Sequence, residues 1–444
     1  MPTTPGLRRP AAAAAAGTAA ALVLSSCAVL STSVREDDTP ESVSTGVPDQ
    51  PVTLRLAFTD DPPTQALVDG FTEQHPNVDI ELQQTQFTDY IKTVKLSMSS
   101  ENPPDIAQYN SGAMDSLVPA GLILDLDEHS EAYGWEETFP TSAMESLHID
   151  PEAAEYGSGS LYAAPGALSV LGVFYNKSLL EEAGVDGPPQ TLGGFEQALE
   201  QVQDRTDATP LGNGSLEVGG FQIWSSLLNV LGDEDEYRDW VYGAPGASIE
   251  TEAAKEATGT LTRWAQEGYL PEGTSAVSDI DAQADFAAGD SAFLVTGNWA
   301  TAELAEEMGE EVGFFLMPGP TGQEPPVAAG SSVSYAISSQ TENYDTAAAF
   351  LDYLGSAEAA QIQLSSGFMP VDPDAPSESE GVMGEVNAGF GRVIEQESLL
   401  PFPDFATPGM VDQLTPGVQG LVTGTTSEEE FLRSLQQEWD EHHE

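Results

Sequence analysis

Apolar and polar residues recur along the chain in patterns that predict alternating strands and helices. Residues 52–58 (VTLRLAF) and 78–83 (VDIELQ) alternate with the period of a β-strand, and an apolar run at 105–109 follows them. A helix with one apolar face fills the first gap, and Thr88 opens a helix in the second. The order strand, helix, strand, helix, strand predicts an open α/β sheet.

An open α/β sheet places its ligand beyond the carboxyl ends of its strands. The loops at 58–63 and 108–114 follow two of the predicted strands, so both are candidate ligand-binding loops. Helical patterns dominate the C-terminal third, and the last helix begins with a capping box from Ser427 to Glu430. About 390 residues after the N-terminal region favour two domains.

The N-terminus has the pattern of an export signal. Arg8 and Arg9 supply positive charge, and the apolar stretch at 11–24 is shorter than the roughly 20 residues that span a bilayer. We therefore predict a signal peptide at residues 1–26.

The only cysteine of the chain, Cys27, directly follows this signal. The segment Leu24-Ser25-Ser26-Cys27 resembles the lipobox of bacterial lipoproteins, which implies a diacylglycerol on the Cys27 sulfur and attachment to the outer face of the cytoplasmic membrane. Residues 27–51 are rich in Ser, Thr, Pro and acids, which predicts a flexible tether. A single cysteine excludes an intrachain disulfide and a thiolate zinc site.

Composition excludes several functions. The chain has 73 acidic and 13 basic residues, a formal charge of −60, and this charge repels nucleic acid and anionic lipid headgroups. No G-x-S-x-G, phosphate-binding or dinucleotide-binding glycine motif occurs, and the five histidines lack metal-ligand spacing and are expected to be exposed. We expect no cofactor, no metal and no enzymatic activity.

Three motifs combine aromatic and amide side chains: LYAAP at 161–165, VFYNKSLLEEAG at 173–184 and TGNWA at 296–300. Sugars donate hydroxyl hydrogen bonds to amides and acids, and their C–H faces stack on aromatic rings. A site that holds Tyr and Trp beside Asn and Asp therefore suits a neutral carbohydrate.

In this order the motifs resemble the bacterial extracellular solute-binding proteins of ATP-driven (ABC) sugar importers, in the family 1 group that includes maltose-binding proteins. The resemblance covers nearly all of residues 52–440. It is carried by LRLAF…LVDGFTEQHPNVDIEL, PPDIAQYN, LYAAPGALSVLGVFYNKSLLEEAGVDGPPQT, FAAGDSAFLVTGNWA and AAAFLDYLGSAEAAQIQLSSGFMPV.

The resemblance implies a two-lobed periplasmic-binding-protein-like fold of type II, with discontinuous α/β lobes joined by a hinge. Lobe one is expected at 52–167 plus 295–331, and lobe two at 168–294 plus 332–444. A carbohydrate, most simply an oligosaccharide, is bound in the cleft between them, and lobe closure delivers it to the permease subunits of the importer. The receptor is expected to be a monomer.

The resemblance also implies particular ligand-binding residues. Tyr175, Trp224 and Trp299 are expected as cleft aromatics, whereas Asn176 and Lys177 are expected to cap a helix. The polar ligand contacts are expected from Asp60, Asp61, Asn110, Ser111, Ser331 and Ser332.

Two alternatives stay open from the residues. The same fold can bind a non-sugar solute such as a polyamine or a polyol phosphate, although scarce Lys and Arg disfavour an anion. The abundant carboxylates also leave a secreted glycosidase as a remote alternative.

Overall fold

The computed structural model describes residues 43–59, 63–109, 114–150, 155–371 and 379–443. The expected signal peptide, the cysteine expected to carry lipid and most of the expected tether lie outside the described residues. Within the described part, every helix is too short or too polar to cross a lipid bilayer.

The predicted alternation of strands and helices at the start of the folded region is confirmed. β1 pairs in parallel with β2 on one side and with β3 on the other, so that Leu56 lies between Leu82 and Ile106. Leu56 is fully buried, as its place in the apolar alternation requires. These elements are β1 (Val52–Phe58), α1 (Pro63–Gln74), β2 (Val78–Gln84), α2 (Phe87–Met98) and β3 (Ile106–Tyr109).

Two long strands, β7 (Ala164–Asn176) and β11 (Ala328–Ile337), lie in the middle of the sheet. All thirteen residues of β7 are buried, which fits its near-continuous apolar sequence. The sheet runs β2-β1-β3-β11-β7-β9-β8, with β10 also beside β7 and β12 beside β11; the remaining strands are β8 (Thr209–Gly212), β9 (Ser291–Gly297), β10 (Val312–Phe315) and β12 (Leu399–Leu400).

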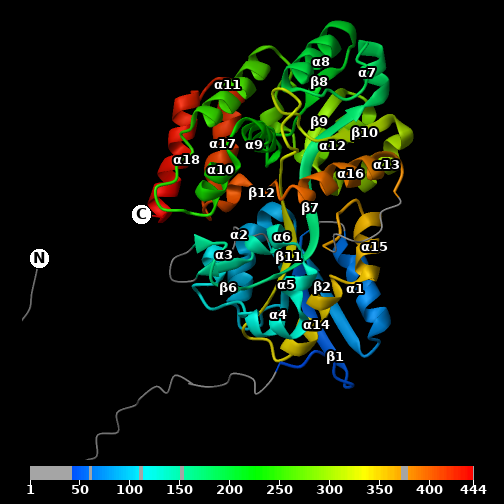
Figure 1. Ribbon diagram of the computed structural model, residues 1–444, viewed down its shortest axis with the longest axis vertical. Coiled ribbons are helices and arrows are strands. Elements are labelled where there is room, and N and C mark those ends of the chain that lie inside the picture. Colours follow the sequence, from blue (N-terminus) through cyan, green and yellow to red (C-terminus); the bar gives the residue numbers. More distant parts are fainter. Residues whose placement is uncertain (1–42, 60–62, 110–113, 151–154, 372–378, 444) are drawn as a thin grey trace, which may run out of the picture. The chain divides into compact units, whose positions relative to one another are not determined.

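β7 changes partners along its length. Its first half, 164–170, pairs with β11, which in turn pairs with β3. Its second half, 171–176, pairs with β9 and β10. Figure 1 shows β7 running through the molecule between the helices near β1 and those near β8. The strand therefore belongs to two groups of elements, one at each end.

Between β3 and β7 the chain forms short helices and a small antiparallel sheet. The helices are α3 (Met114–Leu117), α4 (Asp127–Tyr133), α5 (Trp135–Thr138) and α6 (Thr141–Glu145), and the strands are β4 (His148–Asp150), β5 (Glu155–Tyr156) and β6 (Ser160–Leu161). His129 lies in α4 and is only 3% exposed, so the expectation that every histidine is exposed is wrong for this residue.

The helices after β7 begin where the sequence predicts. The Asn176 side chain accepts the backbone N–H of Leu179, and Thr191 accepts that of Gly194, while Ser427 and Glu430 form the expected capping box. These helices are α7 (Lys177–Ala183), α8 (Leu192–Arg205), α9 (Gly219–Leu231), α10 (Glu234–Val241), α11 (Glu252–Gln266), α12 (Asp279–Ala288), α13 (Thr301–Met308), α14 (Tyr344–Tyr353), α15 (Ala357–Ser365), α16 (Gly381–Glu395), α17 (Met410–Thr423) and α18 (Glu428–His443), with the short turns η3 (Asn298–Ala300) and η5 (Pro403–Phe405).

The packing differs from the expected lobe boundaries in two places. The segment 295–315 was expected in lobe one, yet its residues 295–297 and 312–315 pair with the second half of β7, which was expected in lobe two. Residues 344–365 were expected in lobe two, yet α15 packs on α1 and α14 packs on β11. β7 and β11 each run from one group of elements to the other. The residues that pair with the end of β7, or that follow the end of β11, therefore pack in the group where that strand ends.

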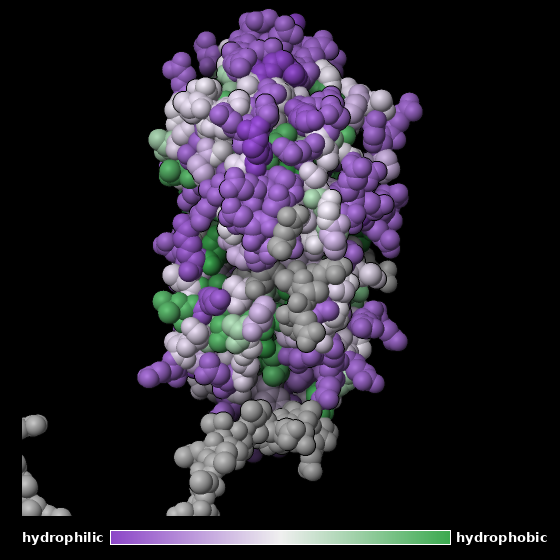
Figure 2. Space-filling model, turned by 90° about the vertical axis from the view of Figure 1, so that its left-hand side faces the viewer, coloured by the Kyte–Doolittle hydropathy of each residue, from purple (hydrophilic) through white to green (hydrophobic). Residues whose placement is uncertain are grey.

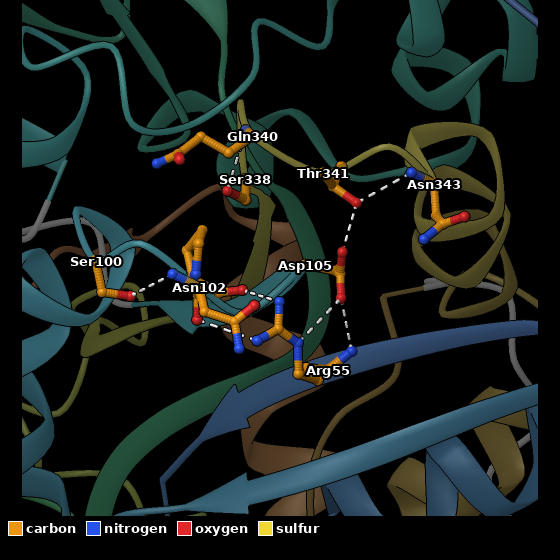
Figure 3. Close-up of polar contacts among 9 residues, drawn as sticks. Arg55, Ser100, Asn102, Asp105, Ser338, Gln340, Thr341 and Asn343 are labelled. Atoms are coloured by element: carbon orange, nitrogen blue, oxygen red, sulfur yellow. Dashed lines mark hydrogen bonds and ion pairs between the residues drawn. The ribbon is translucent and has the colours of Figure 1, made fainter.

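One polar network joins the amino-terminal end of β3 to its neighbours (Figure 3). The Asp105 carboxylate accepts the backbone N–H of Arg55 at 2.9 Å and the hydroxyl of Thr341 at 2.6 Å. The Arg55 guanidinium donates to the carbonyl oxygens of Asn102 and Pro103. Asp105 of the Pro-Asp motif is therefore a structural residue, because it ties β1, β3 and the end of β11 together at the edge opposite the strands' carboxyl ends.

The charge of the chain is carried on its surface. Figure 2 shows hydrophilic side chains over most of one face, with hydrophobic ones in smaller patches. Only a few ion pairs form among the described residues, because acids greatly outnumber bases.

Candidate functional site

A cavity of about 340 Å³ lies at the carboxyl ends of β1 and β3, where an open α/β sheet is expected to bind its ligand. It receives side chains from both groups of elements and from the strands between them. Its lining comprises Thr59, Gln86, Phe87, Tyr90, Ile91, Val94 and Gln108; Ser169, Ser331, Ser332, Val333 and Phe368; and Glu217, Val218, Phe221, Gln222, Asp279, Ile280, Gln283, Thr296, Trp299, Glu303, Phe402, Asp404 and Phe405.

The first wall is built on the ends of β1 and β3 and on α2. The Gln108 side chain accepts the backbone N–H of Thr59 at 3.1 Å and donates to the Thr59 hydroxyl at 3.1 Å. The Tyr90 hydroxyl donates to the backbone oxygen of Gln108 at 2.5 Å, and burial raises its pKa well above the usual range. Ile91 and Val94 continue α2 along the cavity. This wall is fixed by hydrogen bonds and is largely apolar.

The opposite wall contains the amino-terminal end of α9. Asp279 accepts the backbone N–H of Gly219 at 3.0 Å and that of Val218 at 3.3 Å, so the first residue of α12 caps α9. Burial raises the pKa of Asp279 to about 6, and the nearby Glu217 raises it as well, whereas the two N–H groups oppose the shift. Glu217 accepts the backbone N–H of Asp279 at 3.3 Å.

The segment around η5 brings two phenyl rings and a carboxylate to the same cavity. Phe402 and Phe405 pack edge to face with ring centroids 5.6 Å apart, and Asp404 lies between them in sequence. Burial raises the pKa of Asp404 to about 7. The segment is anchored by Tyr237, whose hydroxyl donates to the Pro401 oxygen at 2.9 Å.

Trp299, which the TGNWA motif predicts as a ligand-binding residue, lines the cavity. Its ring lies directly on Gly297, where an added Cβ would come within 2.0 Å of the ring. The ring is therefore held flat against the backbone by a close approach that only glycine permits.

Ser331 and Ser332, two further predicted ligand-binding residues, also line the cavity. The backbone oxygen of Ser331 accepts the Ser169 hydroxyl at 3.0 Å, whereas the Ser332 hydroxyl pairs with the Ser334 hydroxyl at 2.6 Å. The predicted residues Asp60, Asp61, Asn110 and Ser111 lie outside the described residues. They directly follow β1 and β3, the strands whose ends carry Thr59 and Gln108.

Tyr175 is not among the cavity residues, contrary to prediction. It lies near the end of β7, is 6% exposed and packs edge to face on Phe315 with centroids 5.8 Å apart. Its ring covers Gly313 of the neighbouring strand. Tyr175 belongs to a hydrophobic cluster with Leu180, Phe195 and Phe293, on the part of β7 beyond the cavity.

Trp224 is likewise a core residue rather than a cavity residue. It is fully buried, its indole N–H donates to the Thr258 hydroxyl at 2.9 Å, and its ring packs edge to face on Phe431. The ring lies on the face of α9 that contacts α11 and α18. Phe221 and Gln222, about one turn earlier, are the α9 residues that line the cavity.

The sequence analysis missed most of the acidic wall. Glu217, Asp279 and Asp404 are distant in sequence and only tertiary packing brings them to one cavity. The sequence PFPDF at 401–405 held a usable signal, because two aromatic residues flank an acid in a short proline-rich turn.

The cavity lining of the described residues includes acids, amides, hydroxyls and aromatic rings and no Lys, Arg or His. Nor do the described residues hold a group of three His, Cys, Asp or Glu side chains arranged for a metal ion. This lining suits a neutral or cationic ligand with an apolar face and hydrogen-bonding edges.

Comparison with known proteins gives the family. The chain is 24% identical to the xylose/arabinose-binding protein XacG of Haloferax volcanii, over 53% of this chain and 50% of XacG. It is 24% identical to the maltodextrin-binding protein MdxE of Bacillus subtilis, over 80% of each chain. The match spans about half the length of XacG.

Solved structures share the fold. A chitin oligosaccharide binding protein superposes with a TM-score of 0.73 and 22% identity, covering 89% of this chain and 100% of that one. The expected two-lobed α/β architecture is confirmed by such neighbours. The family of bacterial extracellular solute-binding proteins matches residues 66–385, most of the chain, and the protein belongs to this family.

Proposed function

We propose that the protein is an extracytoplasmic carbohydrate receptor that delivers its ligand to an ABC importer. The observation that carries the proposal is the cavity, in which Trp299, Phe402 and Phe405 offer ring faces while amides, hydroxyls and carboxylates offer hydrogen-bonding groups. Sugar rings need both kinds of contact. The protein acts as a binding protein rather than an enzyme, in keeping with its family.

Relatives support a sugar as the ligand. The proteins that this chain resembles are named for binding xylose or arabinose, maltodextrin and chitin oligosaccharides. A polyol phosphate fits the cavity less well, because the described lining offers no cation to pair with a phosphate. The ligand is therefore a saccharide that does not carry a negative charge.

Closure of two lobes around the ligand is part of the proposal. Lobe one comprises 52–168 and 333–371, and lobe two comprises 169–332 and 379–443, so that β7 and β11 form the crossings. The cavity draws its lining from both lobes. Closure buries a ligand more completely. A ligand that makes more contacts in the closed state shifts the population of receptor molecules toward the closed state. The importer's permease then receives the loaded, monomeric receptor.

Trp299→Ala is expected to weaken sugar binding at least tenfold, because the variant loses a stacking face, and tenfold corresponds to about 1.4 kcal/mol. Isothermal titration of the full chain against maltose-type, cello-type, xylo-type and chito-type oligosaccharides first identifies the sugar. The same titration then measures the loss in the variant.

Trp299→Phe is the matched control, because it keeps an aromatic face on Gly297 and should retain most of the affinity. Native thermal unfolding of both variants excludes misfolding as the cause of weaker binding. Silence of the native protein toward every sugar, or undiminished affinity in Trp299→Ala, would contradict the proposed site.

We further propose that the receptor is held at the membrane by lipid on Cys27, on the strength of the Leu-Ser-Ser-Cys sequence. In a bacterial host the native protein should sediment with membranes, and Cys27→Ala should shift it to the soluble extracytoplasmic fraction. Ser33→Ala, a change in the tether, should stay with the membranes. Retention of Cys27→Ala on the membrane would rule the anchor out.

A further inference from the structure

Among the described residues that line the cavity, every charged side chain is a carboxylate, and these carboxylates lie on one wall. The carboxylates are Glu217, Asp279, Glu303 and Asp404, and all four come from lobe two. The described part of the opposite wall, from Thr59 to Gln108, contributes apolar, amide and hydroxyl groups. A ligand therefore meets an electronegative wall on one side, whereas the described part of the other wall is uncharged.

Three of the four carboxylates already have partners. Asp279 accepts two backbone N–H groups of the α9 terminus, and Glu217 accepts the backbone N–H of Asp279. Glu303 accepts the side-chain amide of Gln283 at 2.7 Å. These hydrogen bonds hold the three carboxylates in the wall, and a ligand contact is not needed to satisfy them.

Asp404 differs from the other three. Among the described residues its carboxylate has no hydrogen-bond donor other than its own backbone N–H, and no Lys, Arg or His lines the cavity near it. A carboxylate in a poorly solvated wall without a partner costs free energy unless a ligand supplies one. Because Asp404 lines the cavity, a bound molecule is placed to do so.

The rings beside Asp404 favour the same kind of ligand. Phe402 and Phe405 flank it in sequence, and both line the cavity with Trp299. Aromatic faces attract ammonium groups as well as sugar C–H groups. A cation here meets a carboxylate and ring faces together.

We propose that the cavity selects carbohydrates that carry a protonated amine, and that Asp404 is the residue that recognises the amine. This inference rests on the proposed carbohydrate function and narrows its ligand to basic sugars. A neutral hydroxyl gives Asp404 one ordinary hydrogen bond, whereas an ammonium group gives a charge-assisted bond of roughly twice the strength. A bare polyamine offers neither the C–H face of a sugar ring to Trp299 nor hydroxyl groups to the polar side chains of the cavity.

The experiment compares sugars that differ in one substituent. The full chain is titrated at pH 8, where a buried carboxylate is ionised, with glucose, glucosamine, N-acetylglucosamine and glucuronate. The comparison is repeated with three further sets: cello-, chitosan- and chitin-type trisaccharides; galactose and galactosamine; and maltotriose and its 2-amino analogue. Spermidine serves as the amine without a sugar.

The amine form of at least one pair should bind about tenfold more tightly than its hydroxyl and N-acetyl partners, and glucuronate should bind most weakly. Asp404→Asn should remove this preference, so that the amine, hydroxyl and N-acetyl forms bind to the variant with affinities within a few fold of one another. The variant should fold, because it removes a charge that burial disfavours. Asp239→Asn, on the exposed face of α10, removes the same charge outside the cavity and should keep the preference.

Each other outcome has a definite meaning. Neutral sugars that bind as tightly as their amine forms, or an amine preference that survives in Asp404→Asn, would overturn this inference and leave the carbohydrate receptor intact. Spermidine that binds more tightly than every sugar would show recognition of the amine alone and overturn it too. If no sugar binds, charged or neutral, the proposed function itself fails.

Discussion

Trp224→Ala is expected to lower the free energy of unfolding by about 3–5 kcal/mol, the range for truncating a large buried aromatic side chain. The indole is fully buried and packs on Phe431. Its removal leaves a large void among α9, α11 and α18, and it leaves the Thr258 hydroxyl without the indole N–H that donates to it. Chemical denaturation followed by circular dichroism measures the loss.

Trp224→Phe is the informative companion variant. It refills part of the void with an aromatic ring but still lacks the N–H donor, so its loss should be clearly smaller than that of Trp224→Ala. Sugar affinity, measured on the folded fraction, should change little in either variant, because Phe221 and Gln222 line the cavity instead. A Trp224→Ala protein of native stability that no longer binds sugar would restore the sequence-based assignment of this residue.

Local sequence patterns predicted much of the fold. The alternation in 52–58 and 78–83 gave the first parallel strands, and Asn176, Thr191 and Ser427 marked helix starts that the structure confirms. These features depend on neighbours within a few residues, so one segment contains all the information needed to recognise them.

The site was predicted less completely, because it depends on which face of an element points inward. α9 is buried almost all round, so periodicity did not separate the cavity face of Phe221 from the core face of Trp224. Trp299 lines the cavity, and the motif from which its ligand-binding role was predicted also contains its glycine neighbour. Asp404 lies in the segment PFPDF, whose composition is a local signal, but only the tertiary packing shows that this segment reaches the cavity.

Asn298→Ala should be among the most destabilising single changes at the crossing between the two groups of elements. Asn298 is fully buried; its side-chain oxygen accepts the backbone N–H of Val170 at 2.9 Å, and its amide donates to the oxygens of Leu168 at 3.2 Å and Gly367 at 2.9 Å. Truncation removes the Asn298 bonds to the Val170 N–H and the Gly367 oxygen, at about 1–3 kcal/mol each. The Leu168 oxygen keeps the N–H of Met369. We expect a loss of about 3 kcal/mol or more in the denaturation experiment.

The same change should also weaken sugar binding, because each group that Asn298 contacts adjoins a cavity residue. Ser169 lies between the two bonded residues of β7, Phe368 follows Gly367, and Trp299 follows Asn298 itself. Asn343→Ala is the matched control, since its side-chain amide makes no hydrogen bond to other described residues, and it should be near neutral in both measurements. Equal stability of the two variants would refute the role of Asn298, whereas a loss of stability with unchanged affinity would show that its hydrogen bonds hold the fold without positioning the cavity.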